Sequence, residues 1–215
     1  MTSSSSIKEV GAAIRSKHGD PTVLVNNAGV GFDGTILEES EERIRKTFEV
    51  NTMSHFWMVR EFLPSMVKQN HGHVITIASM ASFVAIGEMA DYCGSKASAM
   101  AFHESLTQEL RTWYKAPKVR TSVIHPMWVA TPMTKQLTDA GSEFKQPIMT
   151  VETVSNAVVK QILGQNSGKV ILPPNLSNYR LVRAFPLWLQ EVARGIGSSH
   201  LMRLRKWEAE QQKKL

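Results

Sequence analysis

The sequence predicts an α/β protein with a doubly wound, parallel, Rossmann-like sheet. Two observations lead to this prediction. Short apolar runs typical of buried strands alternate along the chain with helical patterns of about ten residues or more. Polar motifs directly follow successive runs, and the carboxyl ends of parallel strands share one edge of a sheet, where ligands bind. The alternation indicates βαβ units with helices on both faces of the sheet.

The first predicted elements are an amphipathic helix and a buried strand. Apolar residues recur at helical spacing from Ile7 to Ile14, after serines that offer N-caps, and the pattern ends at Gly19. The continuous apolar run at residues 22–25 is typical of a strand buried on both faces of a parallel sheet. Asn26 ends this run and opens a polar turn that contains glycine.

The remaining elements continue the alternation, and prolines mark several of their ends. In chain order, the patterns predict a helical stretch over residues 39–68 broken near Pro64, a strand over 73–78, a helix over 91–113, a strand over 119–124, a helix over 151–163 and a strand over 169–172. Strands and their crossover helices therefore account for most of the chain.

Composition favours one globular domain and excludes several classes of site. The chain has 215 residues, of which 42% are hydrophobic and 20% are charged. Cys93 is the only cysteine, so neither a disulfide within the chain nor a cysteine zinc site can form. We expect Cys93 to be a packed small hydrophobic residue rather than a nucleophile. The seven histidines lack ligand spacing, and we predict no metal site.

The C-terminal part of the chain carries most of the positive charge. The net charge is +6, and residues 176–215 contain eight Lys and Arg against three Glu. We therefore divide the chain into an incomplete Rossmann-like domain, residues 1–175, and a basic amphipathic extension, residues 176–215. The aromatic and leucine residues of the extension fit two interpretations, a helix packed on the body or an interfacial helix that contacts a membrane. No recognition motif for nucleic acid accompanies the charge.

The sequence shows no hydrophobic targeting or spanning segment. No apolar run approaches the roughly 20 residues needed to cross a bilayer, and the N-terminus lacks the apolar stretch of a secretory signal. We therefore expect a cytoplasmic protein whose contact with a membrane, if it makes one, is peripheral.

Tyr92 and Lys96 form the pattern that is most informative about chemistry. Four residues apart on a helix, their side chains lie on one face, one turn apart. A protonated lysine near a phenol favours phenolate, so we expect the pKa of Tyr92 to lie below its usual value of about 10. Ser79 follows the preceding strand and is expected at the same edge of the sheet. Together these residues indicate a site for proton transfer.

Four motifs in chain order resemble those of the short-chain dehydrogenase/reductase family, whose members transfer hydride between a nicotinamide cofactor and an alcohol or carbonyl group. The resemblance covers nearly the whole chain and implies the fold predicted above. The matching motifs are Asn26-Asn27-Ala28-Gly29 after the first strand, Asn51 in the next helix, the set of Ser79, Tyr92 and Lys96, and the segment from Pro126 to Pro132, in which Met127 stands where the family has glycine.

The resemblance implies a role for each matched residue. Tyr92 would act as general acid or base toward the substrate oxygen, and Ser79 would hydrogen-bond that oxygen. Lys96 would lower the pKa of the tyrosine and hold the nicotinamide ribose, and Asn51 would support a water-mediated proton path. The residues implied to contact the cofactor are Asn27, Tyr92, Lys96, Val129 and Thr131. From the residues alone, Asn51 could instead bond to backbone at a helix irregularity, and Ser79 could cap the turn after its strand.

A finer resemblance is to the retinol-dehydrogenase-like and hydroxysteroid-dehydrogenase-like branch, fungal members included. The segments at residues 126–133 and 172–190 carry it. This branch implies a lipophilic alcohol, aldehyde or ketone as substrate, and frequent association with membranes. The family also implies a homo-oligomer and NADP or NAD as cofactor, of which we favour NADP.

Two features of the family have no counterpart in this sequence, the glycine-rich TGxxxGxG turn and the residue that selects between NAD and NADP. That turn lets backbone N–H groups approach the pyrophosphate of the cofactor. We therefore interpret the chain as lacking the first two βα units of the fold, and expect it to bind cofactor poorly or not at all. Two other interpretations stay open, a non-catalytic relative that serves in dimerisation or interaction, and a peripheral membrane-binding protein.

Overall fold

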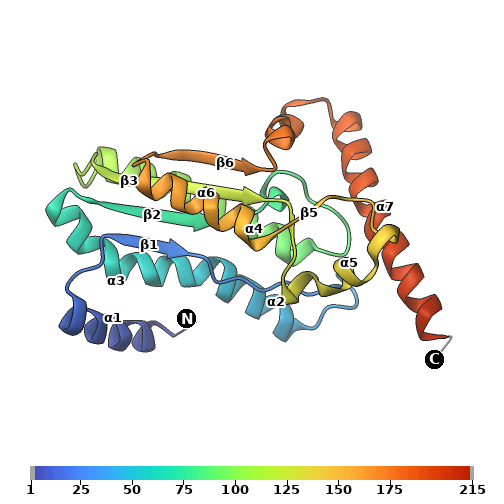
Figure 1. Cartoon of the computed structure of the whole chain (residues 1–215), viewed down its shortest axis with the longest axis horizontal. Helices are drawn as coiled ribbons and strands as arrows, with labels where there is room; N and C mark the ends of the chain where they lie inside the picture. Colours follow the sequence, from blue (N-terminus) through green and yellow to red (C-terminus); the bar gives the residue numbers. More distant parts are fainter. Residues whose placement is uncertain (1–2, 214–215) are drawn as a thin grey trace.

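The sheet of the computed structural model, which describes residues 3–213, has four parallel strands. Their order is β1-β2-β3-β6, and all four point toward the same end of the molecule (Figure 1). This is the predicted parallel α/β architecture, with fewer strands than a full Rossmann fold. The strands are β1 (Val23–Asn26), β2 (Gly72–Ile77), β3 (Val119–Pro126) and β6 (Gly168–Leu172).

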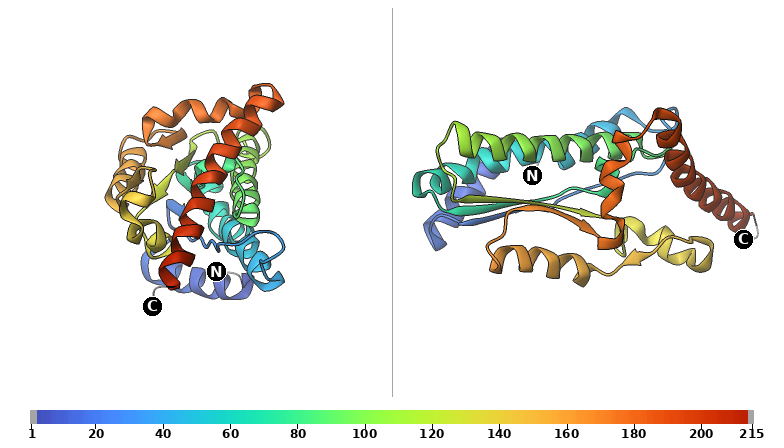
Figure 2. Two further views of the ribbon diagram at one scale, coloured as in Figure 1. Left: turned by 90° about the vertical axis from the view of Figure 1, so that its right-hand side faces the viewer. Right: turned by 90° about the horizontal axis from the view of Figure 1, so that it is seen from above.

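Helices cover both faces of the sheet (Figure 2). One face packs against α3 and α4, and the opposite face packs against α6. None of the helices in the described part of the chain is long and apolar enough to span a bilayer. The helices are α1 (Ser4–His18), α2 (Glu41–Phe48), α3 (Ser54–Gln69), α4 (Ala90–Thr112), α5 (Lys135–Asp139), α6 (Val151–Leu163) and α7 (Leu187–Gln212).

Two apolar layers hold the sheet between its helices. On one side, Leu24 of β1 packs with Phe62 of α3 and Leu106 of α4. On the other side, Ile75 and Ile124 pack with the apolar side chains of α6. Burying an aliphatic or aromatic side chain of this size contributes about 1.5–3 kcal/mol. The β2 strand is buried along its whole length, as expected for an inner strand of a parallel sheet.

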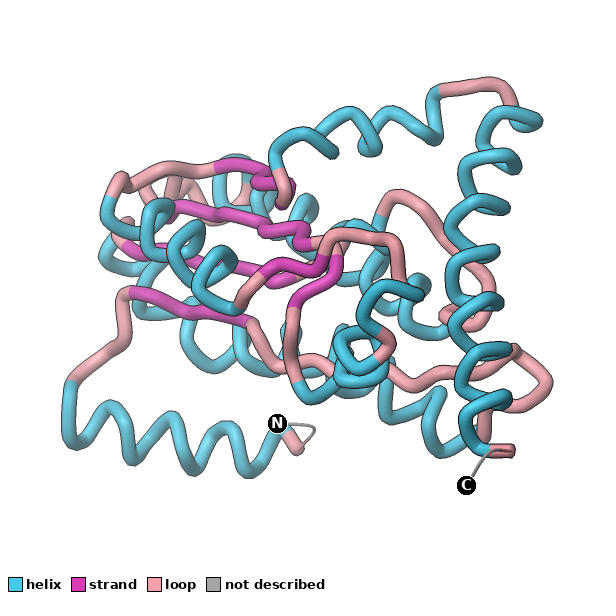
Figure 3. The backbone as a smooth tube through the Cα atoms, turned by 45° about the vertical axis from the view of Figure 1, so that its right-hand side comes forward, coloured by secondary structure: helices cyan, strands magenta, loops and turns pink. Residues whose placement is uncertain are grey.

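Short elements fill the space between the carboxyl ends of the strands and α7 (Figure 3). A small two-stranded sheet pairs β4 (Trp128–Val129) with β5 (Ile148–Met149). A 3₁₀-helical segment, Pro174–Ala184, leads from β6 to α7. Together with the loop after β2, these elements lie between the body of the protein and its C-terminal helix.

The α7 helix stands across the carboxyl ends of the strands (Figure 1). Leu201 and Leu204 on its inner side pack with Leu137 and Phe144, which lie after β3. Gly197 allows a close approach, because a Cβ there would come within 2.7 Å of the Ile86 side chain. On its inner side, α7 is therefore a helix packed on the body, as the first of the two interpretations of the C-terminal extension expects.

The break in the helical stretch after β1 lies at a different place from the one predicted. The sequence pattern places it near Pro64, but α3 runs through Pro64, and the irregularity is a π-helical turn at Glu49–Met53. A proline inside a helix removes one backbone hydrogen bond and crowds the preceding turn. Burial of neighbours such as Phe62 and Met66 offsets this cost, so the helix continues.

The prediction that the first strand is buried on both faces is wrong for β1. Val23 and Val25 are each 38% exposed, whereas Leu24 between them is buried. The reason is that α6 covers β2, β3 and β6, while β1 lies at the edge of the sheet. The side chain of Asn26 is buried at the end of this strand, and its amide has no hydrogen-bond partner among the described residues.

Candidate active site

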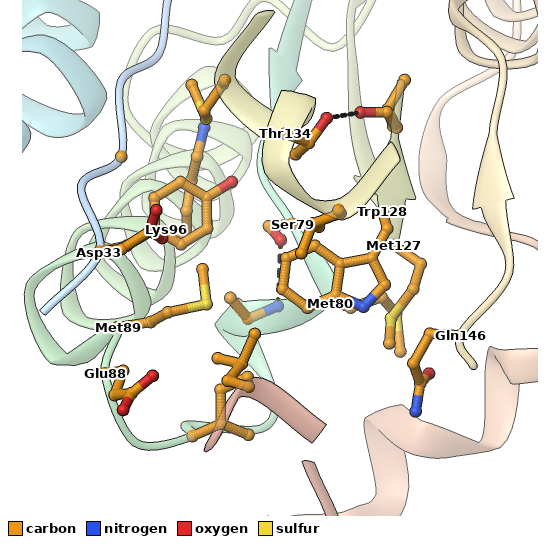
Figure 4. A pocket seen from close by; sticks show the side chains of 18 of the residues that line it. Asp33, Ser79, Met80, Glu88, Met89, Lys96, Met127, Trp128, Thr134 and Gln146 are labelled. Carbon is orange, nitrogen blue, oxygen red and sulfur yellow. Dashed lines mark hydrogen bonds between the residues drawn. The ribbon is translucent and has the colours of Figure 1, made fainter. Parts of the chain in front are cut away.

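A cavity of about 720 Å³ opens at the carboxyl edge of the sheet (Figure 4). Its wall combines the loop after β1, the turn after β2, the first turns of α4, the loop after β3 and the inner side of α7. The volume suits a small-molecule site, and the wall is mostly apolar. Its apolar part includes Met80, Met89, Met127, Trp128, Leu201 and Leu204.

Ser79 and Tyr92 both lie in this wall. The Ser79 hydroxyl accepts a hydrogen bond of 3.1 Å from the N–H of Ala81 and so caps the turn after β2. Burial raises the pKa of Tyr92, and a hydrogen bond from Ser79 partly opposes that rise. The lowered tyrosine pKa expected from the sequence is therefore not found in this structure. The cost of placing a phenolate away from water outweighs the favourable contacts.

Lys96 lies one turn from Tyr92, on the same face of α4, as the spacing predicts. Its Nζ is 5.7 Å from the centre of the Tyr92 ring and donates a 3.0 Å hydrogen bond to the carbonyl oxygen of Ile77. Burial lowers the pKa of Lys96 to about 8. At neutral pH the ammonium group therefore still carries its charge beside the phenol.

Asn51 fixes the loop after β1 from behind the cavity wall. Its side chain accepts a hydrogen bond from the Val30 N–H at 2.8 Å, and donates to the Val30 carbonyl at 2.8 Å and the Ser95 hydroxyl at 3.0 Å. Gly29 lies between Asn51 and Lys96, since a Cβ there would be 3.4 Å from Lys96 Nζ and 3.5 Å from Asn51 Oδ1. These contacts agree with a bond to backbone at a helix irregularity, and the proton path through Asn51 stays a prediction.

The residues predicted to contact a cofactor from outside α4 also line the cavity. They are Asn27, Val129 and Thr131. The Thr134 hydroxyl accepts a hydrogen bond from the Thr131 N–H at 3.1 Å and donates to the Val129 carbonyl, so it holds the loop after β3 in shape. Met127, which stands where the family has glycine, lines the cavity with its side chain.

Cys93 is buried in α4 and is not among the described residues that line the cavity. Its side chain is 3% exposed, which confirms the prediction of a packed small residue. Burial raises the pKa of its thiol and so disfavours the nucleophilic thiolate. In the part of the chain that the structure describes, no three His, Cys, Asp or Glu side chains gather in a way that could hold a metal ion.

Sequence reasoning did not identify which residues of the C-terminal helix line the cavity. Ala193, Gly197, Leu201 and Leu204 face the cavity from this helix. Their spacing of three or four residues is a signal for one helix face. The signal was ambiguous because apolar residues also occur on the opposite side of the same helix.

An ion-pair cluster ties α7 to the rest of the wall. Arg205 contacts Glu38 Oε1 at 2.5 Å and Glu88 Oε1 at 3.3 Å, which links the helix to the loops before α2 and α4. These contacts, led by the hydrogen bond from Arg205, lower the pKa of Glu38 to about 2. Burial raises the pKa of the neighbouring carboxyls of Asp33 and Glu208, which also line the cavity.

A family model described as short chain dehydrogenase matches residues 1–141, about two thirds of the chain. The protein belongs to the short-chain dehydrogenase family. Among curated proteins, it is 52% identical over 122 residues to Dehydrogenase RED3 of Cochliobolus heterostrophus, a match that covers 57% of this chain and 62% of that protein. It is 36% identical over 165 residues to human 17-beta-hydroxysteroid dehydrogenase 13, covering 77% of this chain and 53% of that protein. This short-chain dehydrogenase thus spans about half to three fifths of the length of these relatives.

Solved structures share the fold of this short-chain dehydrogenase. A 4-hydroxyisoleucine dehydrogenase complexed with NADH superposes with a TM-score of 0.68 at 19% identity, covering 80% of this chain and 75% of that one. The ligand-free aldohexose dehydrogenase of Thermoplasma acidophilum also gives 0.68, at 20% identity, covering 80% and 73%. The family match ends before α7, so the helical wall of the cavity lies outside the matched residues.

Proposed function

We propose that this short-chain dehydrogenase is a nicotinamide-dependent oxidoreductase that interconverts a lipophilic alcohol and its carbonyl form. The observation that supports this most is the meeting of Ser79, Tyr92 and Lys96 in one wall of a mostly apolar cavity. Tyr92 exchanges the proton of the substrate oxygen, and Ser79 holds that oxygen by a hydrogen bond. Lys96 keeps a positive charge close to the phenol and so favours the phenolate.

We propose that the cavity receives the nicotinamide half of such a cofactor. Asn27, Val129 and Thr131 line the same cavity as Lys96, and Gly29 lies beside the lysine without a side chain of its own. When bound, the nicotinamide supplies or accepts the hydride. We propose NADP or NAD in this role, with NADP favoured, and Lys96 and Tyr92 as further contacts to the cofactor. The expectation that the 215-residue chain binds it poorly stays a prediction.

The apolar wall supports a lipophilic substrate. Methionine side chains such as Met80, Met89 and Met127 are flexible and adapt to ligands of differing shape. The relatives named hydroxysteroid dehydrogenases agree with this class of substrate. We therefore propose a bulky secondary alcohol or ketone rather than a sugar.

The test measures turnover of bulky secondary alcohols and ketones with NAD(H) and NADP(H). Tyr92→Phe removes the proton that the reaction needs, and should lower kcat by at least about 100-fold with little change in cofactor affinity. Tyr114→Phe, at an exposed position just beyond the C-terminal end of α4, is the matched control and should keep full activity. Undiminished turnover in Tyr92→Phe would show that the proposal is wrong.

Binding of the cofactor is measured separately, by titrating NADH and NADPH against the unmodified chain. Weak or absent binding agrees with the expected shortage of phosphate contacts. Micromolar binding would contradict that expectation and leave the assignment of Tyr92 intact.

A second proposal concerns assembly as a homo-oligomer through the helices that follow β1. Phe48, Met53 and Phe56 are 37–41% exposed on successive turns of α2, the π turn and α3. Apolar side chains repeated along a helix surface are typical of contacts between subunits. Sedimentation of Phe56→Glu against the unmodified protein tests this, because loss of a dimer is the expected result.

A further inference from the structure

The turn after β2, which carries Ser79, is held by a side chain of the neighbouring strand. His125 is the next-to-last residue of β3 and is fully buried. Its Nδ1 lies 3.0 Å from the carbonyl oxygen of Ser79. The same oxygen accepts a hydrogen bond from the N–H of Ser82, also at 3.0 Å, which closes the turn. The position of the Ser79 backbone therefore depends on β3 as well as on its own turn.

This hydrogen bond determines which nitrogen of the His125 ring carries the proton. A carbonyl oxygen only accepts, so Nδ1 donates, and in the neutral ring Nε2 has no proton. Burial lowers the pKa of His125 to about 4, so the ring is neutral at pH 7. Nε2 is buried as well and has no hydrogen-bond partner among the described residues. The hydrogen bond that the ring makes in this structure is thus spent on holding Ser79.

Packing against Phe83 restricts the orientation of the imidazole. The centres of the two rings are 4.5 Å apart, and their planes meet at 42°. Phe83 is itself buried, and its carbonyl oxygen accepts a 3.1 Å hydrogen bond from Nε of Arg183. Because side chains in such an interior are close-packed, the imidazole cannot turn away from Ser79 unless Phe83 also moves.

His125 acts from behind the wall of the cavity. Ser79 and the two residues that follow His125, Pro126 and Met127, line the cavity, whereas His125 is not among the described residues that do so (Figure 4). The Ser79 hydroxyl accepts a hydrogen bond from the Ala81 N–H at 3.1 Å and donates to the Pro126 carbonyl at 3.5 Å. Both contacts of the hydroxyl depend on how the turn lies against the end of β3.

We propose that His125 is a positioning residue, which fixes the backbone of Ser79 and thereby the place of the serine hydroxyl in the cavity. The inference rests on the proposed function, in which this hydroxyl holds the substrate oxygen. His125 does not touch the substrate, so its effect on the rate passes through Ser79. A displacement of about 1 Å costs as much as about 100-fold in rate, and a moved turn would displace the hydroxyl on that scale.

Reduction of the bicyclic ketone decalone, with NADPH in excess, tests this role. His125→Leu keeps an apolar side chain in the site but removes the donor. It should lower kcat by about 10- to 100-fold and change KM by less than about threefold, because the serine hydrogen bond matters most as charge develops on the oxygen. His125→Asn supplies an amide N–H in place of Nδ1 and should bring kcat back to within about fivefold of the unmodified protein.

His73→Leu is the matched control. His73 is also buried, and its Nε2 makes a 2.9 Å hydrogen bond with the Ser122 hydroxyl at the amino end of β2, away from Ser79. Its loss should lower the free energy of unfolding and leave kcat unchanged. The control therefore separates the loss of a buried histidine hydrogen bond in general from the loss of the one to Ser79.

Nuclear magnetic resonance tests the contact without turnover. The nitrogen signals of the His125 ring, assigned by their absence in His125→Leu, should show a proton on Nδ1 and none on Nε2 at pH 7. The amide proton of Ser82 should exchange about tenfold faster in His125→Leu than in the unmodified protein, because the turn that it closes is less firmly held. These measurements also serve if His125→Leu does not fold, since the ring signals are read in the unmodified protein and by comparison with His125→Asn.

Three results would overturn the proposal. The first is a proton on Nε2 rather than on Nδ1. The second is equal kcat in the unmodified protein and a folded His125→Leu. The third is a fall in kcat that His125→Asn does not repair, since the shape of the ring rather than its donor would then matter. Absence of turnover in the unmodified protein counts against the proposed function instead, while a proton on Nδ1 and faster exchange of Ser82 would still support the contact.

Discussion

At the scale of single residues, glycines decide how closely the loop after β1 approaches the candidate catalytic side chains. A Cβ added at Gly31 would lie 3.0 Å from Cδ2 of Tyr92, which is closer than a side chain tolerates without movement. Gly29 plays the corresponding part beside Lys96. The backbone of this loop thus limits the position of the phenol from one side.

Gly31→Ala should therefore displace the Tyr92 ring. A small misplacement of a reacting group costs on the order of 10- to 100-fold in rate, and we expect a fall in kcat of that size with the fold retained. Gly195→Ala is the control, because nothing lies within 4 Å of a Cβ at that position. Steady-state kinetics and circular dichroism measure the two effects. Equal activity in both variants would mean that Gly31 does not position Tyr92.

Asn51→Ala should act on stability as well as on activity. It leaves the N–H and carbonyl of Val30 without their hydrogen bonds, a loss of roughly 1–3 kcal/mol in the free energy of unfolding. Urea denaturation measures this loss, and Asn178→Ala, at an exposed position, is the control. If Asn51→Ala lowers turnover without lowering stability, the main role of Asn51 is chemical rather than structural.

At the scale of elements, α7 is held by the pairs that Arg205 makes with Glu38 and Glu88. The pKa of Glu38 lies below its usual value, so the pairing contributes fully above pH 4.5 and is lost only as the pH falls toward about 2. The ion pair between Arg205 and Glu38 therefore stays in place near neutral pH.

Arg205→Ala should loosen α7 from the cavity. We expect roughly two- to five-fold faster hydrogen exchange in α7, a modest change because both charges are exposed. Arg203→Ala, on the outer side of the same helix, is the matched control. Hydrogen exchange followed by mass spectrometry measures the exchange rates of α7 in both variants. Unchanged exchange in Arg205→Ala would show that apolar packing through Leu201 and Leu204 holds the helix without help.

How far the elements follow from sequence depends on whether their signals are local. The helix predicted over residues 151–163 is α6 with the same bounds, because its apolar stripe and its N-cap at Thr150 are both local signals. The sequence offers a helix irregularity at Asn51 as one interpretation, but it does not show that the irregularity is a π turn or that Asn51 bonds to Val30 and Ser95, which lie far away along the chain. The order of Ser79, Tyr92 and Lys96 was sufficient to predict that they meet.

The exposure of a side chain and its place in a cavity wall depend on which elements pack against it, and the sequence does not show this packing. The run containing Val23 and Val25 is apolar like that of an inner strand, and only the position of α6 leaves them exposed. The same holds for α7, whose role in the cavity depends on where the chain returns after β6. The pKa of Tyr92 was predicted in the wrong direction because burial, which the spacing does not show, outweighs the charge nearby.

At the scale of the whole molecule, four buried histidines make the fold sensitive to acid. His55, His73, His103 and His125 are at most 4% exposed, and burial lowers the pKa of each to about 4. The unfolded chain binds protons near pH 6.5, before the folded protein does. The neutral histidines therefore allow full stability above about pH 6.5, and stability is lost as the pH falls from there toward 4.

Thermal denaturation between pH 7.5 and 4.5 measures this effect. Each histidine should take up to about 1.4 kcal/mol of stability per pH unit over that interval. His103→Gln should flatten the pH profile, and His18→Gln, at an exposed position, should leave its slope unchanged. A melting temperature that does not fall below pH 6.5 would contradict the prediction.

The two-sided nature of α7 has a consequence for how ligands would influence one another. A ligand that binds in the cavity and orders α7 changes the affinity of the outer side of α7 for a second ligand. The second ligand changes the affinity of the cavity for the first by the same factor. An occupied cavity and an engaged outer surface thus form a reciprocal thermodynamic pair. The α7 helix belongs to both surfaces, so its rigidity determines how strongly binding at one surface changes the affinity at the other.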